Sequence, residues 1–381
     1  MNISIKTILN GDIYFHPRAT IIKDKLLMTM QAINGSDFFG PIQYSISSDK
    51  GENWTKPEFV QGMGCVPVSE GTEEAISGVV PESFSQIREG ICDVIADYHP
   101  ASGKVIAIGH NVYYKGNRFY DSIGDFNPSD SELKRFPVYT VQDNQGKWTG
   151  KREKLRFPEF EDYSIYTCNC AQKIILPDGK MLIPITFGNY CRSVTSFLCD
   201  FNGEDLSVIK RGNVLENSVK RGLIEPSMVE YQDKFYMTMR AEDDHGYLSV
   251  SNDGLNWSLI KAWQWNDGTA LTMGSTQQHW LKLGGKLHLV YTRKTEDNTG
   301  VMRWRAPIFI AEVDTQRLCL IKDTEQIVLP MRGDPEKPET IGMMGNFHPL
   351  ALSETEAIVT VGEMRPRMNY SGETLLARLR Y

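Results

Sequence analysis

Arginine and glutamate residues stand at the ends of several expected strands, where side chains from separate strands can meet. Arg18, Arg240 and Arg305 each lie at one end of an apolar run, and Glu225 begins the segment that leads to Arg240. A guanidinium is always charged, and its planar fork matches a carboxylate. A single such arginine more often pairs with a surface acid. Three arginines that converge would hold a carboxylate ligand even in an acidic protein, because the local electrostatic field at a site matters more than the net charge of the protein.

The composition excludes several other classes of function. The 381 residues carry 41 basic and 48 acidic side chains, a formal net charge of −7, which argues against a nucleic-acid partner. No apolar run approaches the roughly 20 residues of a membrane span. The chain contains no P-loop, no G-x-G-x-x-G after a strand and no H-E-x-x-H. Its seven Cys are an odd number typical of reduced thiols, and they lack metal-ligand spacing. We expect no cofactor and no catalytic metal.

The beginning of the chain and the absence of linkers bear on its organisation. The first 20 residues hold one Lys and no apolar core segment, so they do not resemble a secretory signal. We therefore expect a cytoplasmic protein, or a periplasmic or secreted one if a leader was removed. No Pro/Gly/Ser-rich linker interrupts the chain, which favours one domain over residues 1–381. The sequence does not indicate an oligomeric state.

Short apolar runs separated by turn residues recur along the whole chain. Examples are ATIIKDKLLMTMQ and SMVEYQDKFYMTMR, which are typical of hairpins. Leading strands near Arg18, Ile95, Lys173, Met228, Leu287 and Ile358 give six units. This pattern predicts an all-β fold, a six-bladed β-propeller with four-stranded antiparallel blades. A β-sandwich with a second β domain is the alternative. The last run, ETLLARLRY, is expected to pair with the N-terminal unit and close the ring.

A recurring turn motif strengthens the propeller prediction. Residues 47–54, SSDKGENW, follow the pattern S-x-D-x-G-x-x-W; residues 251–257, SNDGLNW, are one residue shorter, and residues 141–148 keep the Asp, Gly and Trp. The carboxylate can accept backbone N–H groups of the turn, the glycine can take a positive φ, and the tryptophan can pack between strands. The role of the motif is structural.

These turns resemble the Asp boxes of the sialidase (neuraminidase) superfamily, whose catalytic domain is a six-bladed propeller. The resemblance covers nearly the whole chain but rests on short segments. It implies that Arg18, Arg240 and Arg305 form the family's arginine triad, which binds a substrate carboxylate. The segment Glu225-Pro226-Ser227 resembles the one that bears the catalytic glutamate, so Glu225 would act as a general base or activate a nucleophile.

Further site residues follow from the same resemblance. Glu363 corresponds to the acid that steadies the first arginine, Arg18. Asp37 is the expected acid for the leaving group, although an Asp in this Gly-Ser turn can be purely structural. The family's nucleophilic tyrosine has no counterpart, because no tyrosine lies between Tyr291 and Tyr370. His348 falls at or near the vacant position, where an imidazole can act as acid or base or be an uninvolved turn residue.

The sequence is consistent with three functions. The first is an exo-acting glycoside hydrolase on a terminal acidic sugar, sialic-acid-like or uronic, which without the tyrosine can invert through an activated water. The second is a polysaccharide lyase on uronate glycans, in which arginines neutralise the carboxylate and a histidine such as His16, His110, His245 or His348 removes a carbon-bound proton. The third is a propeller that binds carbohydrate without catalysis. All three expect an acidic carbohydrate as partner.

Overall fold

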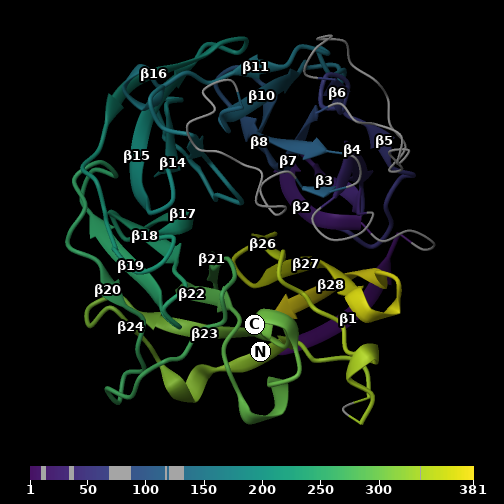
Figure 1. Ribbon diagram of the computed structural model, residues 1–381, viewed down its shortest axis with the longest axis vertical. Helices are drawn as coiled ribbons and strands as arrows, with labels where there is room; N and C mark the ends of the chain where they lie inside the picture. Colours follow the sequence, from purple (N-terminus) through teal and green to yellow (C-terminus); the bar gives the residue numbers. More distant parts are fainter. Residues whose placement is uncertain (10–13, 34–37, 68–86, 116–117, 120–132, 335) are drawn as a thin grey trace.

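The computed structural model describes the chain except residues 10–13, 34–37, 68–86, 116–117, 120–132 and 335. Six antiparallel sheets stand around a common centre (Figure 1). The described residues form strands and short 3-10 helices and no α-helix, so the prediction of an all-β, six-bladed propeller is confirmed. Among the same residues, no helix has the length and apolar character that crossing a bilayer requires.

Each blade runs from an inner strand near the centre to an outer strand. Blade 1 contains β2 (Tyr14–Ile22), β3 (Lys25–Ile33), β4 (Phe39–Ser47) and β5 (Glu58–Phe59). Blade 2 contains β7 (Ile87–His99), β8 (Lys104–Lys115), β10 (Pro137–Gln142) and β11 (Glu153–Lys154), with β6 (Val66–Pro67) and β9 (Arg118–Phe119) paired to it. Blade 3 contains β12 (Ile165–Thr167), β14 (Met181–Gly188), β15 (Arg192–Phe201) and β16 (Leu206–Arg211), with β13 (Ile174–Ile175) paired to β14.

The second half of the ring repeats the arrangement. Blade 4 contains β17 (Ile224–Tyr231), β18 (Lys234–Arg240), β19 (Gly246–Ser251) and β20 (Lys261–Ala262). Blade 5 contains β21 (His279–Leu283), β22 (Lys286–Tyr291), β23 (Ile308–Asp314) and β24 (Cys319–Leu320), with β25 (Gln326–Leu329) paired to β23. Blade 6 contains β26 (His348–Ala351), β27 (Glu356–Arg365), β28 (Ser371–Arg380) and, as its outer strand, β1 (Asn2–Ile8).

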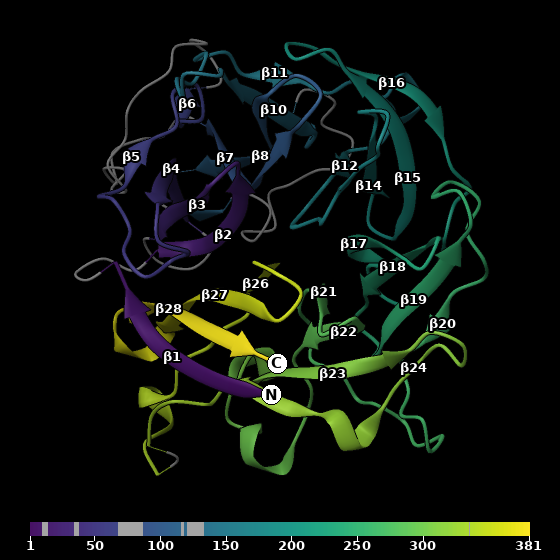
Figure 2. The same cartoon turned by 180° about the vertical axis from the view of Figure 1, so that it is seen from behind.

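The ring closes by pairing the two ends of the chain. β1 lies antiparallel to β28 over seven residue pairs, from Asn2 opposite Arg380 to Ile8 opposite Thr374. Figure 2 shows the two strands side by side with both termini at the same place. The predicted pairing of the last run is confirmed, and it satisfies strand edges that would otherwise be exposed.

The hydrophobic core is divided among the spaces between neighbouring blades. One cluster joins Ile108 and Tyr139 of blade 2 to Ile183 and Phe197 of blade 3, and similar clusters occupy the other junctions. The period-2 alternation of the strands explains this, because both faces of each blade are covered by a neighbour.

Two of the expected leading strands were assigned one strand late: Leu287 and Ile358 lie on β22 and β27, the second strands of blades 5 and 6.

The turn motifs all join the third strand of a blade to its outer strand. After β19, the Asp253 carboxylate accepts the backbone N–H groups of Leu255 (2.9 Å) and Asn256 (2.7 Å). Gly254 there has a φ of +72°. Asp49 and Asp143 accept turn N–H groups in the same way after β4 and β10. Since the third strand runs parallel to the inner strand, these turns lie at the end of the blade where the inner strand finishes.

Candidate functional site

Three inner strands carry the same local irregularity, near the beginning of β2 and β17 and midway along β7. In β2, β7 and β17 the pairing register shifts across two residues, between Phe15 and Arg18, between Cys92 and Ile95, and between Ile224 and Ser227. The first unpaired residue of each bulge has a left-handed backbone: His16 (φ +54°), Asp93 (φ +58°) and Glu225 (φ +51°). Such backbone costs about 1–3 kcal/mol for a non-glycine residue and clusters at functional sites.

The three bulged residues line one cavity at the end of the ring where the inner strands begin. This mouth cavity has a volume of about 600 Å³ and draws its walls from all six blades. Three carboxylates line it, Asp93, Glu225 and Glu242, against six arginines: Arg135, Arg192, Arg221, Arg240, Arg303 and Arg305. The wall is therefore cationic although the chain is net negative, and it suits an anionic ligand.

Arg240 is held in place from three sides. Its Nη1 donates to Glu225 Oε1 (2.7 Å), and its Nε and Nη2 donate to Ser275 Oγ (3.2 and 2.9 Å). Glu242 lies 3.6 Å from Nη2 and is itself bound by both sides of the Arg221 guanidinium. The hydrogen bonds from Arg221 lower the pKa of Glu242 to about 2. This network fixes two guanidinium groups at the wall of the mouth cavity.

Asp93 is the centre of a buried polar cluster beside this network. Its Oδ1 accepts a hydrogen bond from Arg18 Nη2 at 2.8 Å and lies 3.5 Å from His16 Nε2. Burial opposes ionisation of Asp93, but the neighbouring His16 and Arg18 hold its pKa well below the ordinary value. The carboxylate is therefore ionised at neutral pH.

His110 reaches the same cluster from β8. Its Nε2 accepts a hydrogen bond from Arg135 Nη2 at 2.8 Å, and its Nδ1 lies 4.0 Å from Asp93 Oδ2. Because a guanidinium can only donate, the ring proton of neutral His110 is on Nδ1. Burial and Arg135 lower the pKa of His110 to about 3, and burial and Arg18 lower that of His16 to about 4. Both imidazoles are neutral at pH 7.

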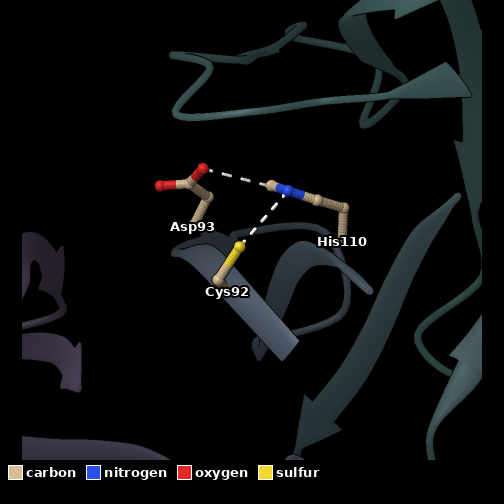
Figure 3. Close-up of side chains that lie close together, drawn as sticks. All are labelled: Cys92, Asp93 and His110. Carbon is tan, nitrogen blue, oxygen red and sulfur yellow. Dashed lines mark hydrogen bonds and ion pairs between the residues drawn. The ribbon is translucent and has the colours of Figure 1, made fainter. Parts of the chain in front are cut away.

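Cys92, Asp93 and His110 are the one group of potential metal ligands in the described residues, their ligand atoms within 4.8 Å of one another (Figure 3). Two guanidinium groups already occupy these atoms, Arg135 on His110 Nε2 and Arg18 on Asp93 Oδ1. A divalent cation there would face two fixed positive charges at close range. The cluster does not fit a resident metal, and we assign none to it.

Three predicted site residues lie away from the mouth cavity. Arg18 is fully buried behind its wall, because the bulge at His16 turns the strand so that His16 faces the cavity instead. Glu363 pairs with Arg365 (2.8 Å) and Arg332 (3.3 Å), not with Arg18. His348 lines a second cavity at the opposite end of the ring. Asp37 lies outside the described residues. Glu225, Arg240 and Arg305 do line the mouth cavity together.

Several residues of the cavity wall were not singled out from the sequence. Asp93, Arg135, Arg192, Arg221 and Glu242 carry no local signal, since none of them belongs to a motif or spacing that predicts a site. The x-Pro pairs at His16-Pro17 and Glu225-Pro226 are a usable signal for a bulge, because proline has no N–H to pair. Asp93 is followed by Val94 and lacks that signal.

Comparison with known proteins identifies solved structures with a similar fold. No family model matches the chain, and no curated protein does. Among solved structures, a Hadza microbial sialidase superposes with a TM-score of 0.65 at 13% identity, covering 97% of this chain and 66% of its own. The NanB sialidase of Streptococcus pneumoniae, in its K499G form, gives 0.65 at 13%, covering 97% and 68%.

Two further structures show the same arrangement. The sialidase of Trypanosoma rangeli gives a TM-score of 0.61 at 14% identity, covering 96% of this chain and 55% of that one. A protein of unknown function from Dyadobacter fermentans gives 0.64 at 12%, covering 99% of both chains. The chain thus spans only part of these sialidases, and identities this low establish the architecture. The protein has a sialidase-like six-bladed β-propeller fold.

Proposed function

We propose that the protein is an exo-acting glycoside hydrolase that removes a terminal acidic sugar, sialic-acid-like or uronic, as a single domain over residues 1–381. The observation that carries this is the row of six arginines around the mouth cavity. Arg240 and Arg305, from blades 4 and 5, would bind the sugar carboxylate through charge-assisted hydrogen bonds. The sialidase-like fold supports the proposal by analogy.

Glu225 is the proposed general base. The bulge at the start of β17 turns its side chain toward the cavity, and Arg240 holds the carboxylate. The oxygen of a water molecule would bond to the anomeric carbon while its proton passes to Glu225. The glycosidic bond breaks with its electron pair going to the leaving oxygen, which takes a proton from the acid, a role predicted for Asp37. No tyrosine nucleophile enters this scheme.

A mass-based assay on acidic oligosaccharides tests the hydrolase. The protein is incubated with a synthetic sialoside and with uronic-acid oligosaccharides, and we expect release of one acidic monosaccharide with the gain of one water. Glu225→Gln is expected to lower kcat by about 10²–10⁴. Glu230→Gln is the matched control, since Glu230 lies on the same strand but lines the opposite cavity. Equal activity of the two variants would contradict the role of Glu225.

A uronate lyase is the second candidate, favoured by the neutral imidazole of His16 in the cavity wall. A neutral imidazole can accept the proton next to a carboxylate that arginines neutralise. The same incubation separates the two reactions, because a lyase gives an unsaturated product that absorbs in the ultraviolet and takes up no water. Binding without any product would indicate a propeller that only binds carbohydrate.

A further inference from the structure

The second cavity, at the end of the ring opposite the mouth, is separate from the proposed active site. This far cavity has a volume of about 330 Å³, and none of the described residues lines both cavities. Residues 168–173 lie between the two, with Asn169 lining the mouth and Lys173 lining the far cavity. The side-chain amide of Gln172 fixes this segment to blade 5, because it donates to Trp280 O (2.9 Å) and accepts from Trp280 N (2.7 Å).

The balance of charge distinguishes the far cavity from the mouth. Two carboxylates, Asp97 and Glu230, and two ammonium groups, Lys173 and Lys282, line it. Lys173 Nζ lies 2.9 Å from Asp97 Oδ2, and the Lys173 side chain is only 1% exposed. An anion would approach Asp97 and a cation would approach Lys173, and the wall offers neither a net opposite charge to offset the loss of hydration. The far cavity therefore favours an uncharged ligand.

Several hydrogen-bonding groups in the wall of the far cavity remain open to a ligand. Lys173 Nζ has three protons, and its partners among the described residues are Asp97 Oδ2 and Ala171 O (3.5 Å). No described residue donates a hydrogen bond to Asp97 Oδ1. His348 is 6% exposed and lines the cavity, and its Nδ1 has no partner in the described part of the chain. Polar groups that are buried without a partner cost free energy, so a ligand that pairs with them is stabilised.

We propose that the far cavity binds a small uncharged sugar or polyol, independently of the mouth. A hydroxyl group both donates and accepts, so neighbouring hydroxyls can accept from Lys173 Nζ and donate to Asp97 Oδ1 without separating the ion pair. Ile175, Val229 and Pro349 also line the cavity and suit the C–H faces of a sugar ring. The volume lies at the lower end of the range for ligand pockets, which fits one monosaccharide.

Saturation-transfer NMR with matched probes tests this site. The uncharged probes are glycerol, D-glucose and D-galactose. D-glucuronate, which has a carboxylate where D-glucose has a hydroxymethyl group, is the probe for the mouth. We expect at least one uncharged probe to bind and to stay bound in excess D-glucuronate. If none of the three binds, the far cavity holds water alone and the proposal is wrong. Displacement by D-glucuronate would show that the two probes share one site, which also contradicts the proposal.

Two changes at the far cavity locate the bound probe. Thr20→Trp fills the cavity from β2, where Thr20 is half-buried, and Asp97→Asn combined with Lys173→Met removes the donor and the acceptor together. Each is expected to weaken the uncharged probe by about tenfold or more and to leave D-glucuronate unchanged. Thermal unfolding shows whether each variant is folded, and undiminished binding of the uncharged probe in either folded variant would overturn the proposal.

Arg240→Gln, at the mouth, separates this proposal from the proposed function. It is expected to weaken D-glucuronate and to leave the uncharged probe unchanged. A weaker uncharged probe in Arg240→Gln would place that probe in the mouth and overturn the second site. If D-glucuronate does not bind the unmodified protein while the uncharged probe binds and is lost in Thr20→Trp, the proposed function is contradicted and the far site stands.

Discussion

The cavities at the two ends of the ring share the inner strands β2, β7 and β17 but differ in chemistry. At the mouth, Asp93 of β7 is surrounded by Arg18, His16 and His110. Four residues further along that strand, Asp97 lines the far cavity, of about 330 Å³, and its described ion-pair partner is Lys173 at 2.9 Å. Burial raises the pKa of Asp97, whereas the partners of Asp93 overcome burial and lower its pKa.

The difference shows what a buried carboxylate needs to stay ionised. Desolvation acts at both ends, so the direction of the pKa shift is decided by the number and kind of groups that face the carboxylate. The bulge accounts for this difference, because it orients Asp93 toward charged and titratable side chains on the strands of blades 1 and 2. The regular part of β7 leaves Asp97 beside Lys173, its ion-pair partner among the described residues. The carboxylate of Asp93 at the mouth is therefore ionised and held in place by its neighbours, whereas Asp97 at the far end belongs to a buried pair with Lys173.

The largest expected effect comes from removing one aspartate charge at each end. Asp93→Asn leaves the Arg18 guanidinium buried without a counter-charge, and we expect a loss of about 3–5 kcal/mol in the free energy of unfolding. Asp97→Asn leaves Lys173, which can release its proton when buried, so we expect about 1–3 kcal/mol. Urea unfolding measures both.

Double variants check the reason for this difference. Arg18→Met combined with Asp93→Asn removes both charges and is expected to regain most of the lost stability, while glucuronate binding stays weakened. Lys173→Met with Asp97→Asn is expected to regain stability and to leave binding unchanged. If Asp97→Asn cost as much as Asp93→Asn, the proposed contrast between the two ends would be wrong.

Replacing one histidine at each end should change the pH dependence of stability in both cases but should change ligand binding only at the mouth. Burial lowers the pKa of His16, at the mouth, to about 4 and that of His348, at the far end, to about 3. An unfolded histidine takes up its proton near pH 6.5, so each residue makes the protein less stable as pH falls from about 6.5 toward its folded pKa. The contribution is on the order of 3 kcal/mol for His16 and on the order of 5 kcal/mol for His348.

Replacement by glutamine removes this dependence. Unfolding measured from pH 7.5 to 4.5 should depend less steeply on pH in His16→Gln and in His348→Gln. Glucuronate binding at pH 7 should weaken in His16→Gln alone, because His348 does not reach the mouth cavity. Weaker binding in His348→Gln would show that the two ends are coupled.

The same contrast explains what the sequence could and could not predict. Hairpins and turn motifs are local, so the six-bladed fold followed from residues close together in the chain. Glu225 and Arg240 are also local, being the two ends of one hairpin that meet at 2.7 Å. The Asp93 cluster joins strands from different blades through bulges, and a bulge changes which residue faces the axis. For this reason Arg18 was expected at the cavity wall where His16 lies.

The smallest expected effect concerns the turns at the far end of the blades. Asp253→Ala removes the acceptor for the N–H groups of Leu255 and Asn256, and we expect a loss of about 1–2 kcal/mol, comparable to losing a helix cap. Urea unfolding measures this loss, and glucuronate binding should remain unchanged because the turn lies opposite the mouth cavity. Asp253→Asn, which keeps an acceptor oxygen, should lose less. A variant that weakened ligand binding as strongly as it weakened the fold would mean that this turn also holds the mouth in shape, and the division of the blade into a structural end and a binding end would no longer stand.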